Sequence, residues 1–184
     1  MLNVNAQLLE QINNISVKAG IATLEIYQRD FSVLEKDDKS PLTEADLASH
    51  KLIVAELIQA FPDVPVLSEE AADIAWQERK SWDEYWLIDP LDGTKEFIKQ
   101  NGEFTINIAL IQNNKPVLGS VYAPALNTLY SGATGVGAFK QIENNQPVTI
   151  FVEKPAADEL WKVVGSRSHQ SAEITQFLES YSNH

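Results

Sequence analysis

The chain has 184 residues, a net charge of −12 and no cysteine. This charge argues against a surface that binds nucleic acid or anionic membranes, because both are polyanions. Without cysteine there is no disulfide, thiolate metal site or cysteinyl-phosphate intermediate, and a reducing cytoplasm is compatible with the composition. No apolar run has the length of a membrane span and no secretory signal opens the chain. We expect a cytoplasmic protein, with peripheral attachment to the inner membrane left open.

Two helices are predicted in the N-terminal third of the chain. Apolar residues spaced by four and three predict an amphipathic helix over residues 5–28. A second helix over residues 44–60 is apolar on most sides, so we expect it to pack centrally. Thr43 and Asp46 have the spacing of a capping box that would begin this second helix.

Strands dominate the prediction for the rest of the chain, with a hairpin turn at 112–115. The predicted strands are 64–67, 86–88, 104–111, 116–122, 127–131, 137–141 and 148–151. A linker at 154–158, a strand at 160–165 and a helix at 170–181 follow. Helices layered against a mostly antiparallel sheet predict an α+β fold. We expect one domain over 1–153 and the start of a second over 154–184.

The most informative segment, residues 86–97, is an apolar strand followed by Asp-Pro-Leu-Asp-Gly-Thr. It places Asp89 and Asp92 at the predicted strand end, beside the start of a helix. Carboxylate oxygens and a backbone carbonyl such as that of Leu91 are typical Mg²⁺ ligands. Free amides at a helix start bind anionic oxygens. The segment therefore favours a site for Mg²⁺ and phosphate.

Gly93 and Thr94 would complete this site on the phosphate side. Gly93 tolerates a positive φ and lets a phosphate approach the backbone. Thr94 fits a helix N-cap, and its hydroxyl could hold a water in line with a bound phosphorus. The alternative is a plain strand–turn–helix junction, in which Asp-Gly is a common turn pair and Thr a common cap.

Two upstream acidic clusters each allow a structural and a functional interpretation. Glu69, in the Ser-Glu-Glu segment at 68–70, could be another metal ligand. Ser68 could equally cap a helix whose first-turn acids stabilise it by roughly 0.3–1 kcal/mol each. Asp46 either only closes its capping box or faces the metal site and accepts a proton from Thr94. Lys36 could balance nearby carboxylates.

Together these segments resemble the lithium-sensitive, Mg²⁺-dependent phosphatase superfamily of inositol monophosphatases, fructose-1,6-bisphosphatases and bisphosphate nucleotidases. The matching motifs stand in the family's order: Ser-Pro-Leu-Thr-x-Ala-Asp at 40–46, Ser-Glu-Glu at 68–70 and Asp-Pro-Leu-Asp-Gly-Thr at 89–94. Finer features are similar to the CysQ-type 3′(2′),5′-bisphosphate nucleotidases. They are Lys-Glu-Phe at 95–97, residues 101–110, and Gly-Ser-Arg-Ser-His at 165–169.

The resemblance implies a layered αβαβα sandwich. It also implies Mg²⁺-dependent hydrolysis of adenosine 3′,5′-bisphosphate to AMP and phosphate, in sulfur assimilation. It assigns water activation to Asp46 and Thr94, and metal binding to Glu69, Asp89, Asp92 and the Leu91 carbonyl. The implied substrate contacts are Glu69, Leu91, Asp92, Gly93, Thr94, Ser166 and His169. The alternative is that Ser166 only ends a strand and His169 only begins a helix.

One family motif has no match in the chain. Family members continue with a Trp-Asp-x-x-Ala-Gly-like segment whose Asp completes a second metal site, and Trp82-Asp83 lies upstream without the Ala-Gly. We interpret the chain as a fragment of a longer protein with an incomplete second domain. Alternative functions are an inositol monophosphatase, a sugar bisphosphatase, or an inactive fragment that binds metal or phosphate. The number of metals and a homodimer stay open.

Overall fold

The structure is a computed structural model that describes residues 1–35, 41–71, 74–154, 156, 159, 163–164 and 171–179. The chain divides into two compact units, residues 1–150 and 151–184. The sequence placed the boundary at residue 153. The first unit contains a long sheet and two long helices, and the second contains the helix α5 (Ala172–Glu179), inside the predicted 170–181.

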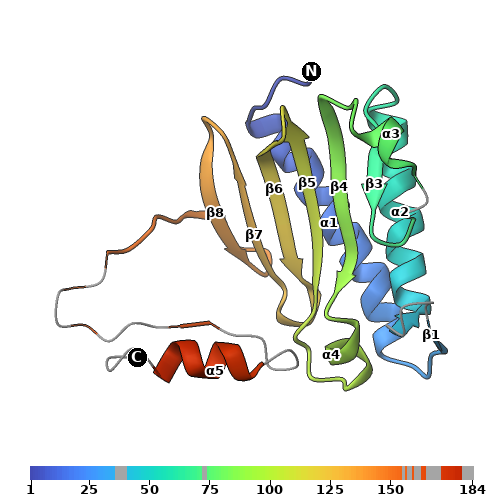
Figure 1. The fold of residues 1–184 in the computed structure, drawn as a ribbon, viewed down its shortest axis with the longest axis vertical. Coiled ribbons are helices and arrows are strands. Elements are labelled where there is room, and N and C mark those ends of the chain that lie inside the picture. The colour runs from blue at the N-terminus through green and yellow to red at the C-terminus, as the bar shows by residue number, and fades with distance from the viewer. Residues whose placement is uncertain are drawn as a thin grey trace. The chain divides into compact units, whose positions relative to one another are not determined.

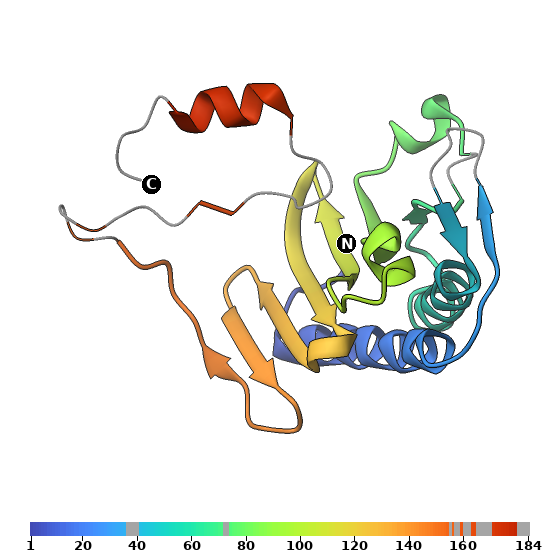
Figure 2. The same cartoon turned by 90° about the horizontal axis from the view of Figure 1, so that it is seen from below.

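The two long helices of the first unit lie on the same face of the sheet (Figures 1 and 2). Helix α1 (Ala6–Tyr27) begins at Asn5, whose side chain accepts a hydrogen bond from the amide of Leu8. Helix α2 (Glu44–Ala60) has the predicted bounds and begins at the predicted Thr43–Asp46 capping box. Such boxes satisfy amides that have no partner inside the helix.

The first unit is built on a seven-stranded sheet with the order β3-β4-β5-β6-β7-β8-β9. The strands are β3 (Val66–Ser68), β4 (Glu84–Asp92), β5 (Thr105–Gln112), β6 (Lys115–Ala123), β7 (Thr128–Ala133), β8 (Gly137–Ile142) and β9 (Val148–Thr149). Only the β3–β4 pair is parallel, so the C-terminal ends of these two strands meet at one edge.

Successive side chains of each strand point to opposite faces of the sheet, one covered by the helices and one open. Trp86 and Ile88 of β4 are buried with Ile53 of α2 in the main core. Leu87 points to the opposite face and is 41% exposed, as is Val121 of β6. Fully burying one such aliphatic side chain contributes about 1.5–3 kcal/mol, so the helix-covered face holds this unit together.

A second, smaller core lies beneath the end of β4. Helix α4 (Thr94–Ile98) buries Phe97 against Phe104, with ring centroids 5.0 Å apart. Leu91 and Ile26 belong to the same cluster, and the ring of Tyr27 packs on both phenylalanines. These contacts attach the segment after β4 to the end of α1.

Several local predictions differ from the structure. Two short strands, β1 (Val33–Glu35) and β2 (Pro41–Thr43), were not predicted, and neither were the helical turn α3 (Trp76–Arg79) and the 3₁₀ turn η1 (Pro124–Leu126). Strand β4 does not end at Ile88 but continues to Asp92 through an irregularity in its pairing with β5. Of the predicted strand 160–165, only residues 163–164 are described, and they are not in a strand.

The segment after β3 does not begin a helix, which the structural interpretation of Ser68 had predicted. Ser68 does not cap a helix: residues 69–70 form a turn, and a bridge joins Ser68 to Ala71. The Ser68 hydroxyl accepts the amide of Glu70, at 3.2 Å, within this turn. Pairing of β3 with β4 therefore prevails over the local capping preference.

Candidate metal and phosphate site

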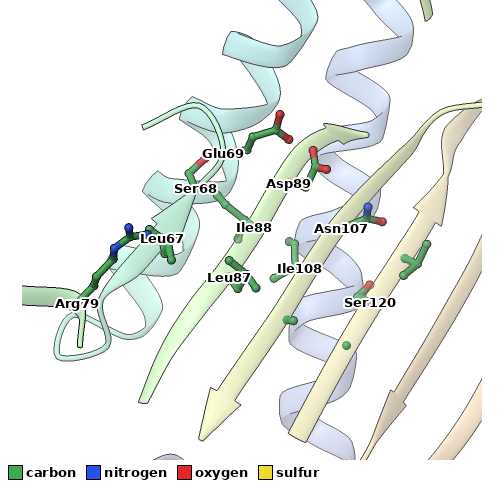
Figure 3. A pocket seen from close by; sticks show the side chains of 13 residues that line it. Leu67, Ser68, Glu69, Arg79, Leu87, Ile88, Asp89, Asn107, Ile108 and Ser120 are labelled. Atoms are coloured by element: carbon green, nitrogen blue, oxygen red, sulfur yellow. The ribbon is translucent and has the colours of Figure 1, made fainter. Parts of the chain in front are cut away.

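Parallel pairing brings Glu69 beside Asp89. Ser68, the last residue of β3, pairs with Ile88, and the amide of Glu69 donates to the Ile88 carbonyl at 3.1 Å. Asp89 follows Ile88 directly. The two carboxylates consequently lie at the same end of neighbouring strands, as Figure 3 shows.

Asp89 lies in surroundings that disfavour its ionised form. Burial, the negative charge of Glu69 and then that of Asp92 raise the pKa of Asp89 to about 7. One of its oxygens, Oδ1, is buried and has no hydrogen-bond partner among the described residues. A carboxyl group that two neighbouring carboxylates repel, and that has a buried oxygen without a partner, fits a hard cation, which would supply positive charge and an oxygen-binding centre.

The irregularity in β4 changes the direction of the chain between the two aspartates. Asp89 pairs with Asn107 and Asp92 with Thr105, so β4 has one residue more than β5 over this interval. Leu91, inside the irregularity, has its side chain buried in the smaller core, whereas Asp92 is exposed. The extra residue thus lets Asp92 emerge near Asp89.

Asn107 lies beside two of the proposed metal ligands, and the sequence reasoning did not single it out. Its Nδ2 donates to Asp92 Oδ2 at 3.4 Å, and its Oδ1 is buried without a partner among the described residues. It pairs with Asp89 across β4 and β5, so both side chains lie on the open face. A polar residue between the buried Ile106 and Ile108 was the available signal.

Asp46 and Thr94, 48 residues apart, are hydrogen-bonded to each other. The Thr94 hydroxyl donates to Asp46 Oδ1 at 3.0 Å and lies 3.4 Å from the Leu91 carbonyl. Asp46 Oδ2 accepts the amide of Thr43 at 2.8 Å and its hydroxyl at 2.5 Å. Asp46 is fully buried, so these bonds hold its carboxylate in a single orientation. The structural and the functional interpretation of Asp46 are both compatible with this geometry.

The prediction that Thr94 is an N-cap is wrong. The cap of α4 is Gly93, which has a φ of +97°, and Thr94 is the first residue inside the helix. A Cβ on Gly93 would lie 2.8 Å from the Glu103 carbonyl, so this turn requires glycine. The Thr94 hydroxyl is consequently directed to Asp46 and not to the helix amides.

The carboxylates do not form a preassembled cage. Among the described residues, no three His, Cys, Asp or Glu side chains converge as a group that could hold a metal ion. A cation would rely on pairs of these carboxylates, the Leu91 carbonyl, water and substrate oxygens, which is typical of Mg²⁺. Lys36, Ser166 and His169 lie outside the described residues, so their predicted roles stay predictions.

An open groove of about 480 Å³ begins at the carboxylates and runs along the uncovered face of the sheet. Glu69, Asp89 and Asn107 lie toward one end and Arg79 toward the other (Figure 3). The remaining lining is mainly apolar: Leu67, Ser68, Leu87, Ile88, Ile108, Ala109, Gly119, Ser120 and Val121.

None of the helices described in the structure is long and apolar enough to span a membrane.

Comparisons with known proteins relate this site to a family. Residues 5–184 match the model of the inositol monophosphatase family. The chain is 44% identical over 179 residues to the 3′(2′),5′-bisphosphate nucleotidase CysQ of Escherichia coli (strain K12), covering 96% of this chain and 70% of that protein. It is 45% identical over 141 residues to CysQ of Haemophilus influenzae, covering 77% and 52%.

Solved structures give the same result. The crystal structure of CysQ from Bacteroides thetaiotaomicron has a TM-score of 0.78 at 36% identity, covering 96% of this chain and 70% of that one. An IMPase from Thermotoga maritima has a TM-score of 0.67 at 29% identity, covering 84% and 56%. The predicted α+β fold of the inositol monophosphatase type is confirmed. The chain belongs to the inositol monophosphatase family.

Proposed function

We propose that the site hydrolyses a phosphomonoester with Mg²⁺, and that its substrate is adenosine 3′,5′-bisphosphate, which gives AMP and phosphate. The observation that carries the proposal is the Thr94 hydroxyl, which the buried Asp46 holds and which lies 3.4 Å from the Leu91 carbonyl, inside the segment that carries Asp89 and Asp92. A phosphate hydrolase needs a place for a cation and a group that orients water, and these two features supply them.

Glu69, Asp89, Asp92 and the Leu91 carbonyl would hold Mg²⁺. The ion, when bound, would lower the pKa of a coordinated water and neutralise charge on the phosphoryl group. The raised pKa of Asp89 supports this assignment, because a carboxylate destabilised by its neighbours gains most from a cation. The chain has no cysteine, and direct attack by water requires no covalent intermediate.

Thr94 and Asp46 would orient the attacking water. The Thr94 hydroxyl donates its hydrogen to Asp46, which leaves its oxygen lone pairs to accept a hydrogen bond from water. Because Asp46 accepts from Thr43 as well, its carboxylate stays in place while the water reacts. The amides of Gly93 and Thr94 would bind the phosphate oxygens.

Similarity to the CysQ nucleotidases supports a bisphosphorylated nucleoside as substrate. The Lys-Glu-Phe sequence at 95–97, which resembles that branch, supports the same choice. A role in sulfur assimilation and inhibition by lithium are part of this proposal, as are substrate contacts from Ser166 and His169.

The test measures phosphate release from adenosine 3′,5′-bisphosphate and from inositol 1-phosphate, with Mg²⁺ and with or without Li⁺. We expect lithium-sensitive release mainly from the nucleotide, and no release by the Asp92→Asn variant. Faster release from inositol 1-phosphate would overturn the substrate assignment. No release, with Mg²⁺ still raising the melting temperature, would show that the chain binds metal without turnover.

A further inference from the structure

Helix α2 directs three consecutive residues of one face toward the candidate site. Asp46, Ser49 and His50 stand at positions i, i+3 and i+4, which lie on the same side of a helix. Each contacts a different segment that carries proposed site groups. Asp46 bonds Thr94 at the start of α4, as described above, and the other two contact the ends of β4 and β3.

Ser49 is bonded to the irregular part of β4. Its hydroxyl is fully buried and donates to the Pro90 carbonyl at 2.6 Å. Pro90 lies between Asp89 and Leu91, inside the interval where the pairing of β4 with β5 is interrupted. A side-chain donor at this point holds a backbone segment that the sheet itself does not hold.

His50 is bonded to the turn that carries Glu69. Its Nδ1 lies 2.8 Å from the Ser68 hydroxyl, which also accepts the amide of Glu70 at 3.2 Å. A hydroxyl has one donor and two acceptor positions, so Ser68 can donate to His50 and accept from Glu70 at once. Burial, followed by the charge of Lys51, lowers the pKa of His50, which favours the neutral imidazole that this arrangement needs.

We propose that Ser49 and His50 are positioning residues that set the spacing between Glu69 and the Asp89–Asp92 pair by anchoring both strand ends to α2. The inference rests on the proposed function, because the groups positioned are the proposed metal ligands. A helix is more rigid than the two segments, so bonds to adjacent residues of α2 hold those segments in a constant relation. Groups that orient metal ligands in this way typically change metal affinity about 10- to 100-fold when removed.

The test measures the melting temperature of the whole chain across a Mg²⁺ titration, beginning in EDTA. The variants are His50→Leu, His50→Asn, Ser49→Ala and Ser68→Ala, with Lys51→Ala as an exposed control on the same helix. Leu removes the bond, whereas Asn retains a hydrogen-bonding group near the position of Nδ1. We expect His50→Leu, Ser49→Ala and Ser68→Ala to need about 10-fold more Mg²⁺ for half of the melting shift. His50→Asn and Lys51→Ala should stay within about threefold of the unchanged chain.

The outcomes separate this inference from the proposed function. If the unchanged chain shows no Mg²⁺-dependent shift, the proposed function fails and the inference with it. If the chain responds but His50→Leu and Ser49→Ala respond at the same Mg²⁺ concentration, only the positioning roles are overturned. If the His50→Leu variant does not fold, the Ser68→Ala variant tests the His50–Ser68 bond in its place. A combined His50→Leu/Ser68→Ala variant should need no more Mg²⁺ than either single variant. That result would support the conclusion that both changes act by breaking the same His50–Ser68 bond.

Discussion

At the scale of single residues, the Asp46 carboxylate joins the start of α2 to Thr94, a proposed site residue. One oxygen closes the capping box of α2, and the other accepts the Thr94 hydroxyl. Because the carboxylate is fully buried, each of its bonds replaces one that water would otherwise make. A change at Thr94 should therefore affect stability as well as the proposed chemistry.

We expect Thr94→Val, which keeps the side-chain volume and removes the hydroxyl, to lower the free energy of unfolding by about 1–3 kcal/mol. The reason is that Asp46 Oδ1 loses its bond from Thr94 while it stays buried. Phosphate release should fall by at least about 100-fold, since water loses its orienting group. Thr94→Ser should retain most of the free energy of unfolding and most of the rate of phosphate release. Urea unfolding and a phosphate assay measure them, and turnover by Thr94→Val at the unchanged rate would contradict the role given to Thr94.

At the scale of elements, the contact of α1 with β6 depends on Gly20. A Cβ at this position would lie 2.5 Å from Tyr122 Cε1 and 2.9 Å from Pro124 Cγ. Both neighbours are ring atoms, which cannot rotate away as a flexible chain would. Glycine therefore permits the close approach of α1 to the sheet at that point, although it is a poor helix former.

We expect Gly20→Ala to lower the free energy of unfolding by about 1–3 kcal/mol, despite the gain in helix propensity of about 1 kcal/mol. The exposed neighbour Ile21 provides the control, because Ile21→Ala changes α1 without entering the contact. That variant should stay within about 0.5 kcal/mol of the unchanged chain. Urea unfolding measures both, and a stabilised Gly20→Ala would mean that α1 moves away from β6 at no cost.

At the scale of the whole molecule, the carboxylate cluster links global stability to pH. The pKa of Asp89 is about 7 in the folded chain and near 3.8 when unfolded. Between these values the folded state keeps a proton that the unfolded state has lost. Stability without metal should therefore fall as pH rises from about 4 to 7, and this contribution should be constant above pH 7.

We expect Asp89→Asn to lack this fall, so its advantage over the unchanged chain in EDTA should grow from pH 5 to pH 8. With Mg²⁺ at pH 8, the unchanged chain should instead be the more stable of the two. The reason is that Mg²⁺ stabilises the ionised Asp89 carboxylate, which the variant lacks. Urea unfolding at four pH values, with EDTA or Mg²⁺, measures both effects. Parallel stability curves for the two chains in EDTA would contradict the assignment.

Local pattern in the sequence determined much of the fold and the identity of most proposed site residues. Helix α2 has its predicted bounds because a capping box and a continuous apolar pattern agree over the same residues. The hairpin of β5 and β6 follows from two apolar runs joined by a short polar turn. Asp46, Glu69, Asp89, Asp92 and Thr94 could be named because their three motifs together resemble a known family, whereas each motif alone also allowed a structural interpretation.

Tertiary structure alone decided which of these residues meet. Glu69 lies beside Asp89 because β3 pairs with β4 in parallel, and Asp46 meets Thr94 across 48 residues. Asn107, Ser49 and His50 were missed, since a polar residue in a strand or helix has no local sign of its partner. Capping and periodicity act over three or four residues and are visible in sequence, whereas strand pairing and buried hydrogen bonds depend on how distant segments pack.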